Sequence, residues 1–174
     1  FYPGPGLGGH CIPLDPYYLT WKAREYGFHT SMIEASMMIN DKMPEYCVDR
    51  AGKVLNRVKK ALNGSKVLVL GVAYKADIDD YRESPAIDVI EILHREGASV
   101  DFFDPYIPKF RAHGKEYVGI ADISPEVIAS YDLVFVAAAH TKVDYEMIEK
   151  NAQAIFDSKN AMKDVKKREK IEVL

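Results

Sequence analysis

Apolar residues recur with two different periods along this chain, and the change of period divides it into two parts. In residues 31–62 apolar side chains return every three or four positions, which is the period of a helix with one buried face. From residue 66 onward, short apolar runs alternate with helical patterns. The first part therefore predicts a long helix, and the second predicts an α/β domain.

Beyond residue 63 the chain alternates between segments typical of buried strands and segments typical of helices. The predicted strands are 66–74, 98–105, 132–139 and 154–160, and the predicted helices are 85–96, 124–131 and 145–151. This alternation predicts an α/β, Rossmann-like fold, an open and mostly parallel sheet with helices on both faces. The tail from Ala161 is charged, and we assign it no firm structure.

Proline, glycine and serine mark where the helices begin and end. Ser84 is typical of an N-cap, Pro85 of a first helical position, and Gly97 of the residue beyond a C-terminus. Pro44 is expected either to kink the helix of residues 31–62 or to begin its second part. Residues 1–16 are rich in proline and glycine, so we predict a loop there, followed by a short helix over 17–27.

Length, composition and charge narrow the class of protein. The 174 residues, 48% of them hydrophobic, suffice for one domain with a sizeable core and a helical extension. The net charge of −3 argues against a nucleic-acid partner, and no apolar run approaches the length of a membrane span. Two cysteines make no disulfide framework and favour a reduced, cytoplasmic setting. Because the chain begins at Phe1, we expect an excised part of a longer protein.

Gly4, Gly6 and Gly9 have the spacing of a dinucleotide-binding fingerprint, but their context is wrong for one. Such a fingerprint needs a strand before it and a helix that opens at its last glycine. Only Phe1, Tyr2 and Pro3 precede Gly4, and Pro13 opposes a regular helix through the turn that follows. We therefore expect no dinucleotide site here.

Cys11 is the candidate nucleophile in this loop. Gly8 and Gly9 carry no side chains, so a ligand can approach the backbone and the thiol, although a flexible surface loop is the plainer alternative. Structural cysteines usually lie on apolar faces, as Cys47 does on the predicted helix. Asp15 follows four residues after Cys11. No second pair of ligands accompanies the thiol, so we expect no metal site.

A second candidate site follows the strand predicted over 66–74. Tyr74, Lys75 and Arg82 lie between that strand and the helix that begins at Pro85. Ligands of open α/β sheets bind outside the carboxyl ends of the strands, and two cations beside a helix N-terminus suit a diphosphate. Arg82 can equally pair with a neighbouring carboxylate, and composition favours neither alternative.

Two further polar residues end predicted strands. His140 follows the strand 132–139, where it can touch a ligand or cap a turn with Thr141, and we favour the turn. Asp104 ends the strand 98–105, a position where an acidic residue can bind a ribose hydroxyl.

Two stretches together carry a family resemblance. "GPGLGGHCIPLDPYYL" and "GVAYKADIDDYRESPA" resemble, in order and separation, motifs of the UDP-glucose/GDP-mannose dehydrogenase family. "HCIP" and the following "YYLTWKAREYG" are most similar to its UDP-N-acetylglucosamine 6-dehydrogenase branch, with the UDP-N-acetylmannosamine dehydrogenases second. The similarity runs from residue 1 to about residue 160 and corresponds only to the C-terminal part of the usual family chain.

The resemblance implies an activity and roles for named residues. The family oxidises the C6 alcohol of a nucleotide sugar to a carboxylate with two NAD+. Cys11 matches its nucleophile, which passes through a thioester, and Asp15 matches its aspartate for the water-dependent steps. The implied substrate-binding residues are Tyr2, Gly8, Gly9, Tyr74, Lys75 and Arg82, and Arg82 is also expected to contact the cofactor or to hold the domains together. His10 stands where UDP-glucose enzymes carry serine, which argues against glucose as the sugar.

The resemblance also implies a division of the chain and its partners. Residues 1–30 match the remnant of a central domain, 31–62 a connecting helix that forms a homodimer, and 63–174 a UDP-sugar-binding domain. The family's N-terminal domain, which holds most of the NAD, and its catalytic lysine and asparagine are missing, so we expect this segment alone to be inactive.

Two alternatives remain at this point. One is a non-catalytic module for nucleotide binding or dimerisation, in which Cys11 is unreactive. The other is a different thiol enzyme whose α/β domain holds its own cofactor, which would require a complete dinucleotide fingerprint.

Overall fold

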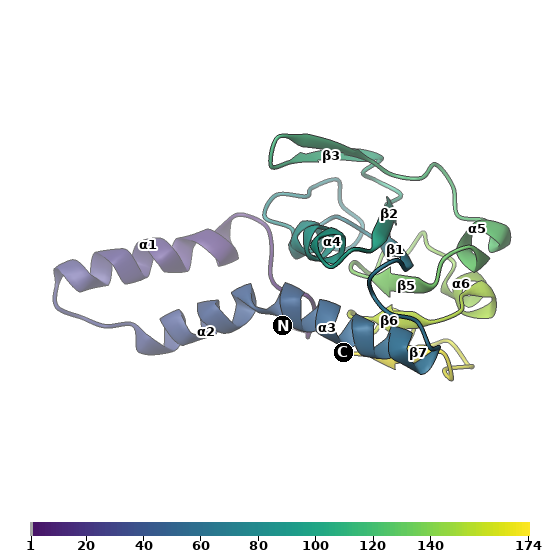
Figure 1. The fold of residues 1–174 in the computed structure, drawn as a ribbon. Helices are drawn as coiled ribbons and strands as arrows, with labels where there is room; N and C mark the ends of the chain where they lie inside the picture. The colour runs from purple at the N-terminus through teal and green to yellow at the C-terminus, as the bar shows by residue number, and fades with distance from the viewer. Residues whose placement is uncertain (1) are drawn as a thin grey trace.

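Two helices project from an α/β body in the computed structural model, which describes residues 2–174 (Figure 1). The helices are α1 Cys11–Glu25, α2 Ser31–Asp41, α3 Met43–Arg57, α4 Pro85–Arg95, α5 Pro125–Ala129 and α6 Tyr145–Asn151. The strands are β1 Lys66–Leu70, β2 Ser99–Phe103, β3 Lys109–Ala112, β4 Lys115–Val118, β5 Leu133–Val136, β6 Ile155–Asp157 and β7 Ile171–Val173. None of the helices within this range is long and apolar enough to cross a membrane.

Five strands form one parallel sheet in the order β2-β1-β5-β6-β7. Their continuous apolar sequences follow from this position, because a strand covered on both faces has no solvent side for polar residues. The chain leaves β1 toward β2 on one side and later returns to β5 on the other side. The switch point of the sheet therefore lies between the carboxyl ends of β1 and β5.

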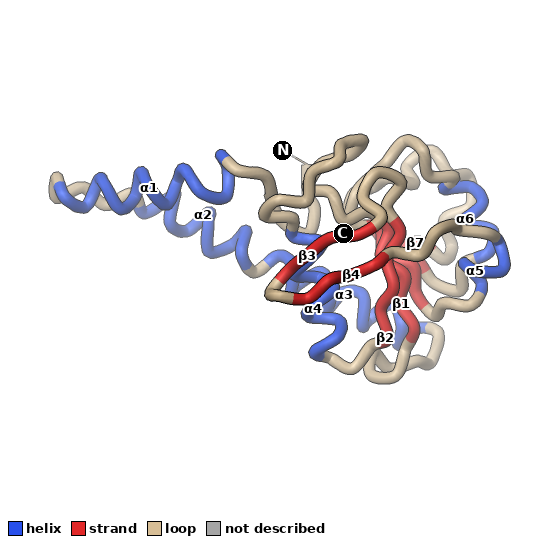
Figure 2. The backbone as a smooth tube through the Cα atoms, turned by 90° about the horizontal axis from the view of Figure 1, so that it is seen from above, coloured by secondary structure: helices blue, strands red, loops and turns tan. Residues whose placement is uncertain are grey.

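Helices cover both faces of the sheet, as the alternation of elements predicts (Figure 2). Val67 and Val69 of β1 face a core shared with α3 and α4, whereas Leu68 and Leu70 face a second core shared with α5 and α6. Successive residues of a strand point to opposite faces, so one apolar strand serves both cores.

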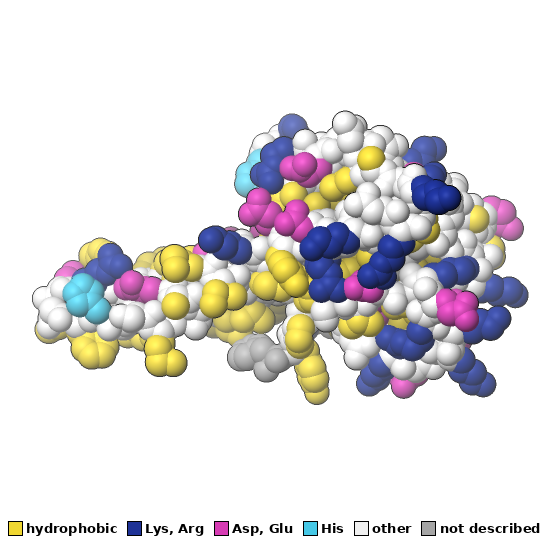
Figure 3. Space-filling model, turned by 60° about the horizontal axis from the view of Figure 1, so that its bottom comes forward, with side chains coloured by type: hydrophobic (Ala, Val, Ile, Leu, Met, Phe, Trp, Pro, Cys, Tyr) yellow, Lys and Arg dark blue, Asp and Glu magenta, His cyan; other side chains and the backbone are white. Residues whose placement is uncertain are grey.

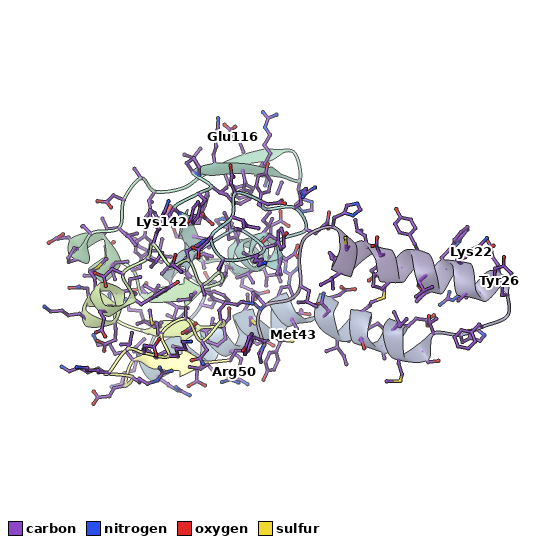
Figure 4. All side chains as sticks on the ribbon, turned by 180° about the vertical axis from the view of Figure 1, so that it is seen from behind. Lys22, Tyr26, Met43, Arg50, Glu116 and Lys142 are labelled. Atoms are coloured by element: carbon purple, nitrogen blue, oxygen red, sulfur yellow. The ribbon has the colours of Figure 1, made fainter. Side chains whose placement is uncertain are left out.

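The projecting pair α1 and α2 is much less buried than the body. Thr20 is the buried residue of α1, and α2 has none. Apolar side chains lie exposed along the pair and gather there in the space-filling view, whereas lysine and arginine gather on the body (Figure 3). The exposed residues of the pair include Tyr17, Tyr18, Leu19, Trp21, Tyr26, Phe28, Met32, Met38 and Ile39. Lys22 and Tyr26 mark the far end of the pair, and Met43 lies where it joins the body (Figure 4).

The expectation of a loop through residue 16 is wrong, because α1 already begins at Cys11. Pro13 occupies the first turn, where a backbone N–H would have no partner inside the helix, so it costs no hydrogen bond. Pro16 removes one bond, and the helix continues to Glu25. Gly27, with a φ of 70°, follows the C-terminus as expected.

The single helix expected over residues 31–62 is two helices. The break lies at Lys42, and Pro44 lies in the first turn of α3, which confirms the second of the two outcomes considered for this proline. α3 ends at Arg57, earlier than expected. Its apolar stripe buries Cys47, Ala51 and Leu55 against the sheet.

Two regions of strand were not anticipated. β3 and β4 form an antiparallel hairpin whose Phe110 stacks on Tyr117 at a centroid distance of 4.8 Å. The charged tail contains β7, which extends the sheet beyond β6. Glu172 of β7 accepts hydrogen bonds from Arg50 and Arg57 of α3. The tail is therefore held by these ion pairs as well as by Met162 and Val165, which are buried in the core on the α5 and α6 face.

Gly71→Ala is expected to destabilise the body strongly. Gly71 has a φ of 83°, and a Cβ there would lie 2.5 Å from Cβ of Ala138 at the end of β5. The free energy of unfolding, from urea titration, is expected to fall by about 2–4 kcal/mol. Gly114 has a similar φ of 77° with no atom within 4 Å, so Gly114→Ala is the matched control and costs about 1 kcal/mol. Equal losses in the two variants would contradict the steric argument.

Candidate functional site

The glycine loop and the loop that follows β1 lie directly against each other. The backbone N–H of Gly9 donates a hydrogen bond to the carbonyl oxygen of Arg82 at 3.0 Å. A Cβ on Gly8 would lie 2.5 Å from the carbonyl oxygen of Glu83 and 2.6 Å from Cβ of Tyr74. The two stretches that carry the candidate chemistry are therefore brought together by the fold.

These contacts explain why positions 8 and 9 are glycine. Gly9 has a φ of 90°, and a Cβ on it would lie 3.0 Å from the ring of Tyr74. At Gly8 and Gly9 the space that side chains would fill belongs to the neighbouring loop. Their expected contact with substrate remains a prediction, now alongside an observed role in loop packing.

Cys11 lies exposed at the first position of α1, two residues after the contact of Gly9 with Arg82. The helix places Asp15, also exposed, one turn further along the same side. The thiol is therefore accessible at a helix N-terminus, beside the loop that carries Lys75 and Arg82.

Cys47 has the opposite environment, as its place on the apolar stripe predicts. It is fully buried in α3, and burial raises the pKa of its thiol to about 12, against smaller opposing effects of Arg50 and Lys159. The two cysteines thus form an internal comparison between an accessible and a sealed thiol.

Lys75 is exposed, whereas Arg82 is already paired. Its guanidinium donates to both carboxylate oxygens of Asp80, with Nη2 2.6 Å from Oδ2. This hydrogen bonding lowers the pKa of the Asp80 carboxyl. Of the two alternatives for Arg82, the structure shows the local ion pair with Asp80. The backbone carbonyl oxygen of Arg82 accepts from Gly9 and so joins the two loops.

Lys159 is a third cation at this side of the molecule, and the sequence analysis missed it. It follows β6, and a Cβ on Gly4 would lie 2.5 Å from its Nζ. Burial lowers the pKa of its amine. Tyr2, an expected substrate residue at the start of the same loop, is 91% exposed. The position of Lys159 beside Gly4 follows from the tertiary fold, since no local sequence signal connects this lysine with the glycine loop.

His140 and Asp104 belong to a buried network, which corrects the expectation for Asp104. The turn favoured for His140 is present, because its carbonyl oxygen accepts from the N–H of Val143 at 3.3 Å, and its ring is buried. The N–H of Asp77 donates to Nδ1 of His140 at 3.0 Å, and Nε2 of His140 lies 3.0 Å from Oδ2 of Asp104. Asp104 also accepts hydrogen bonds from four backbone N–H groups, those of Val72, Ala73, Tyr106 and Ile107. A carboxylate so fully used has no acceptor left for a ribose hydroxyl.

Hydrogen bonding also decides the charge of Asp104. Burial opposes ionisation, but the bonds from His140 and from the backbone N–H groups of Tyr106 and Val72 outweigh it and lower the pKa of the carboxyl. Because Nδ1 of His140 accepts a hydrogen bond, the imidazole is neutral and Nε2 carries its proton. The pair is therefore an ionised carboxylate held by a neutral donor.

The switch point of the sheet is closed by the chain itself. Gly71 meets Ala138 at the ends of β1 and β5, and the segment from Asp77 bonds to His140 and Thr141 across the same gap. A dinucleotide in an open α/β sheet needs this crevice free and lined by a glycine fingerprint. The described residues do not fit NAD at this place.

Comparison with known families agrees with both motifs. Residues 68–164 match the UDP binding domain of the UDP-glucose/GDP-mannose dehydrogenase family, and residues 1–42 match its central domain. The chain belongs to this family. The glycine loop with Cys11 lies in the part that matches the central domain, and Lys75 and Arg82 lie in the part that matches the UDP binding domain.

Similar family members act on N-acetylated sugars by name. The chain is 39% identical over 139 residues to UDP-N-acetyl-D-glucosamine 6-dehydrogenase of Salmonella typhi, an alignment that covers 78% of this chain and 32% of the relative. The UDP-N-acetyl-D-mannosamine dehydrogenase of Methanocaldococcus jannaschii is 32% identical, with 92% and 36% covered. The chain spans about a third of the length of these curated relatives.

Solved family structures have the same fold. UDP-D-ManNAc dehydrogenase from Pyrococcus horikoshii aligns with a TM-score of 0.82 at 29% identity, over 99% of this chain and 40% of that one. NDP-N-acetyl-D-galactosaminuronic acid dehydrogenase from Methanosarcina mazei aligns with a TM-score of 0.81 at 27% identity, over 100% and 39%.

The two cysteines are expected to differ sharply in reactivity. Iodoacetamide at pH 8 should alkylate Cys11 at least about 100-fold faster than Cys47, because only Cys11 is accessible and the Cys47 thiol stays protonated. Mass spectrometry of tryptic peptides measures both rates. In denaturant the two rates should converge, and unequal rates there or equal rates in the folded chain would refute the contrast.

Proposed function

We propose that this chain is the part of an NAD-dependent UDP-sugar 6-dehydrogenase that binds the nucleotide sugar and carries the thiol, with a UDP-N-acetylhexosamine as substrate. The observation that carries the proposal is the contact of Gly8 and Gly9 with residues 74–85, which brings the loop before Cys11 against the loop that contains Lys75 and Arg82. The names of the similar enzymes, which act on UDP-N-acetylated sugars, support the class of sugar.

Lys75, Arg82 and the N-terminus of α4 would hold the diphosphate. Lys75 is exposed at the carboxyl side of β1, and α4 begins at Pro85, three residues after Arg82. Cationic side chains and the free N–H groups of a helix N-terminus together suit an anion. Arg82 would exchange its pairing with Asp80 for a phosphate or cofactor contact, or stay as a structural pair.

Cys11 would act on the sugar at its aldehyde stage. The thiolate adds to the C6 carbonyl carbon and forms a thiohemiacetal; after the second oxidation the sugar is bound as a thioester. Water then adds to the thioester carbon, which releases the carboxylate and returns the thiolate. Asp15, one turn away on α1, would take the proton of that water.

NAD is the oxidant of the proposed reaction, and the residues described here do not supply its site. The closed switch point leaves no crevice for a dinucleotide, so we propose that the cofactor is held by another part of the enzyme. This segment alone is then inactive, although able to bind UDP.

A homodimer through residues 31–62 is also part of the proposal, and we now add α1, which pairs with α2, to the proposed interface. The exposed apolar side chains of α1 and α2 support it, because contiguous apolar surface outside a core is typical of a protein interface. We also propose that the enzyme is located in the cytoplasm, because its two cysteines are free thiols.

Cys11→Ser in the intact enzyme is expected to reduce NADH formation at least about 1000-fold, because the hydroxyl is a far weaker nucleophile. Absorbance of NADH with a panel of UDP-hexoses measures this and identifies the sugar. Cys47→Ala is the matched control and should leave turnover nearly unchanged. Full turnover in Cys11→Ser would remove the thiol from the mechanism.

Lys75→Ala is expected to weaken UDP binding by about 1–3 kcal/mol, the loss of a charged hydrogen bond. Isothermal titration calorimetry of the intact enzyme measures the affinity, with Lys53→Ala on the exposed side of α3 as the control. Unchanged affinity for UDP would remove Lys75 from the site.

The proposed enzyme and the non-catalytic alternative differ in whether UDP-sugar protects Cys11 from alkylation. If the chain only binds nucleotides, UDP-sugar should leave the alkylation rate of Cys11 unchanged. In the proposed enzyme, bound UDP-sugar should slow that alkylation at least about tenfold, because the sugar covers the thiol.

A further inference from the structure

His140 is the one imidazole of the described residues that is 0% exposed, and both of its ring nitrogens are used. Nδ1 accepts from the backbone N–H of Asp77, and Nε2 donates to Asp104. Asp104 is fixed in turn by backbone N–H groups at the end of β1 and after β2. The ring therefore connects the three segments that follow β1, β2 and β5.

The hydrogen bond to Asp77 restrains the loop that carries the proposed binding groups. Asp77 is two residues after Lys75, and its φ of 62° is a left-handed conformation that a non-glycine residue adopts only when its surroundings hold it there. Further along this loop, the N–H of Tyr74 donates to the carbonyl oxygen of Asp80 at 3.1 Å. The carbonyl oxygen of Arg82 then receives the N–H of Gly9, two residues before Cys11.

We propose that His140 is a positioning residue, which fixes the 74–85 loop through Asp77 and thereby places both Lys75 and the Cys11 loop. This inference rests on the proposed function, since it concerns the same site. The imidazole touches no substrate; it acts by supplying an acceptor at Nδ1. The side chain of Asp77 adds a second restraint, since its carboxylate accepts from the N–H of Thr141 at 2.9 Å and from the hydroxyl of Tyr106 at 3.3 Å.

Two substitutions separate the two bonds of the ring. The Oδ1 of an asparagine occupies the place of Nδ1, so His140→Asn keeps an acceptor for Asp77 and loses the donor to Asp104. The Nε2 of a glutamine occupies the place of the ring Nε2, so His140→Gln keeps the donor and loses the acceptor. Each variant loses one buried hydrogen bond, and similar losses in thermal stability make the two comparable.

The expected result is a difference between these variants in the loop and in binding. In His140→Gln the amides of Asp77 and Gly9 should exchange with solvent about tenfold faster than in the parent chain, and UDP affinity should fall about tenfold. His140→Asn should keep the exchange rates and the UDP affinity within about threefold of those of the parent chain. Amide exchange by NMR and calorimetry with UDP are the measurements, made on the full chain.

The parent chain supplies a test that needs no variant. Two-bond proton–nitrogen NMR spectra should show a neutral ring with its proton on Nε2. A proton on Nδ1, or equal behaviour of the two variants in amide exchange, would overturn the positioning role. If the parent chain binds no UDP at all, the proposed function fails instead, and the exchange rates of Asp77 and Gly9 still decide the role of His140.

Discussion

The approach of two backbones, at Gly8 and Gly9 on one side and residues 74–85 on the other, is the constraint on which the candidate site depends. Separations of 2.5 to 3.0 Å from a hypothetical Cβ leave room only for glycine. One hydrogen bond between Gly9 and Arg82 fixes the relative position of the loops. Without this contact the thiol at the start of α1 and the cation after β1 would belong to separate parts of the molecule.

The body of the protein has the topology of a dinucleotide-binding sheet but uses its switch point differently. In such sheets the crevice between the diverging strands receives the ligand. Here Gly71, Ala138 and the His140 network fill it, and the loop that closes it presents Lys75 outward. Because this crevice is filled, the proposed binding groups lie outside it, on the loop that follows β1.

The projecting pair α1 and α2 and the α/β body differ in how much apolar surface they bury. The body has two cores, one on each face of the sheet, and its helices α3 and α4 bury complete apolar stripes. The pair α1 and α2 buries little and leaves aromatic side chains in solvent, which is the surface of the proposed interface. Cys11 lies where α1 joins the body, so a movement of α1 and α2 relative to the body would also move the thiol.

The sequence by itself determined the strands β1, β2, β5 and β6, the helices α4, α5 and α6, the two motifs, the contrast between Cys11 and Cys47, and the family. Those features depend on local period, on turn residues and on residue types that are read along the chain. It did not determine the hairpin of β3 and β4. Nor did it determine the start of α1, because Pro13 is harmless only where the N–H is unpaired, or the strand β7, whose ion pairs with α3 join residues more than a hundred positions apart. Tertiary structure alone decided why Gly8 must be glycine, where Lys159 lies, and that Asp104 bonds to His140 instead of being free for a ribose, because each depends on contacts between distant segments.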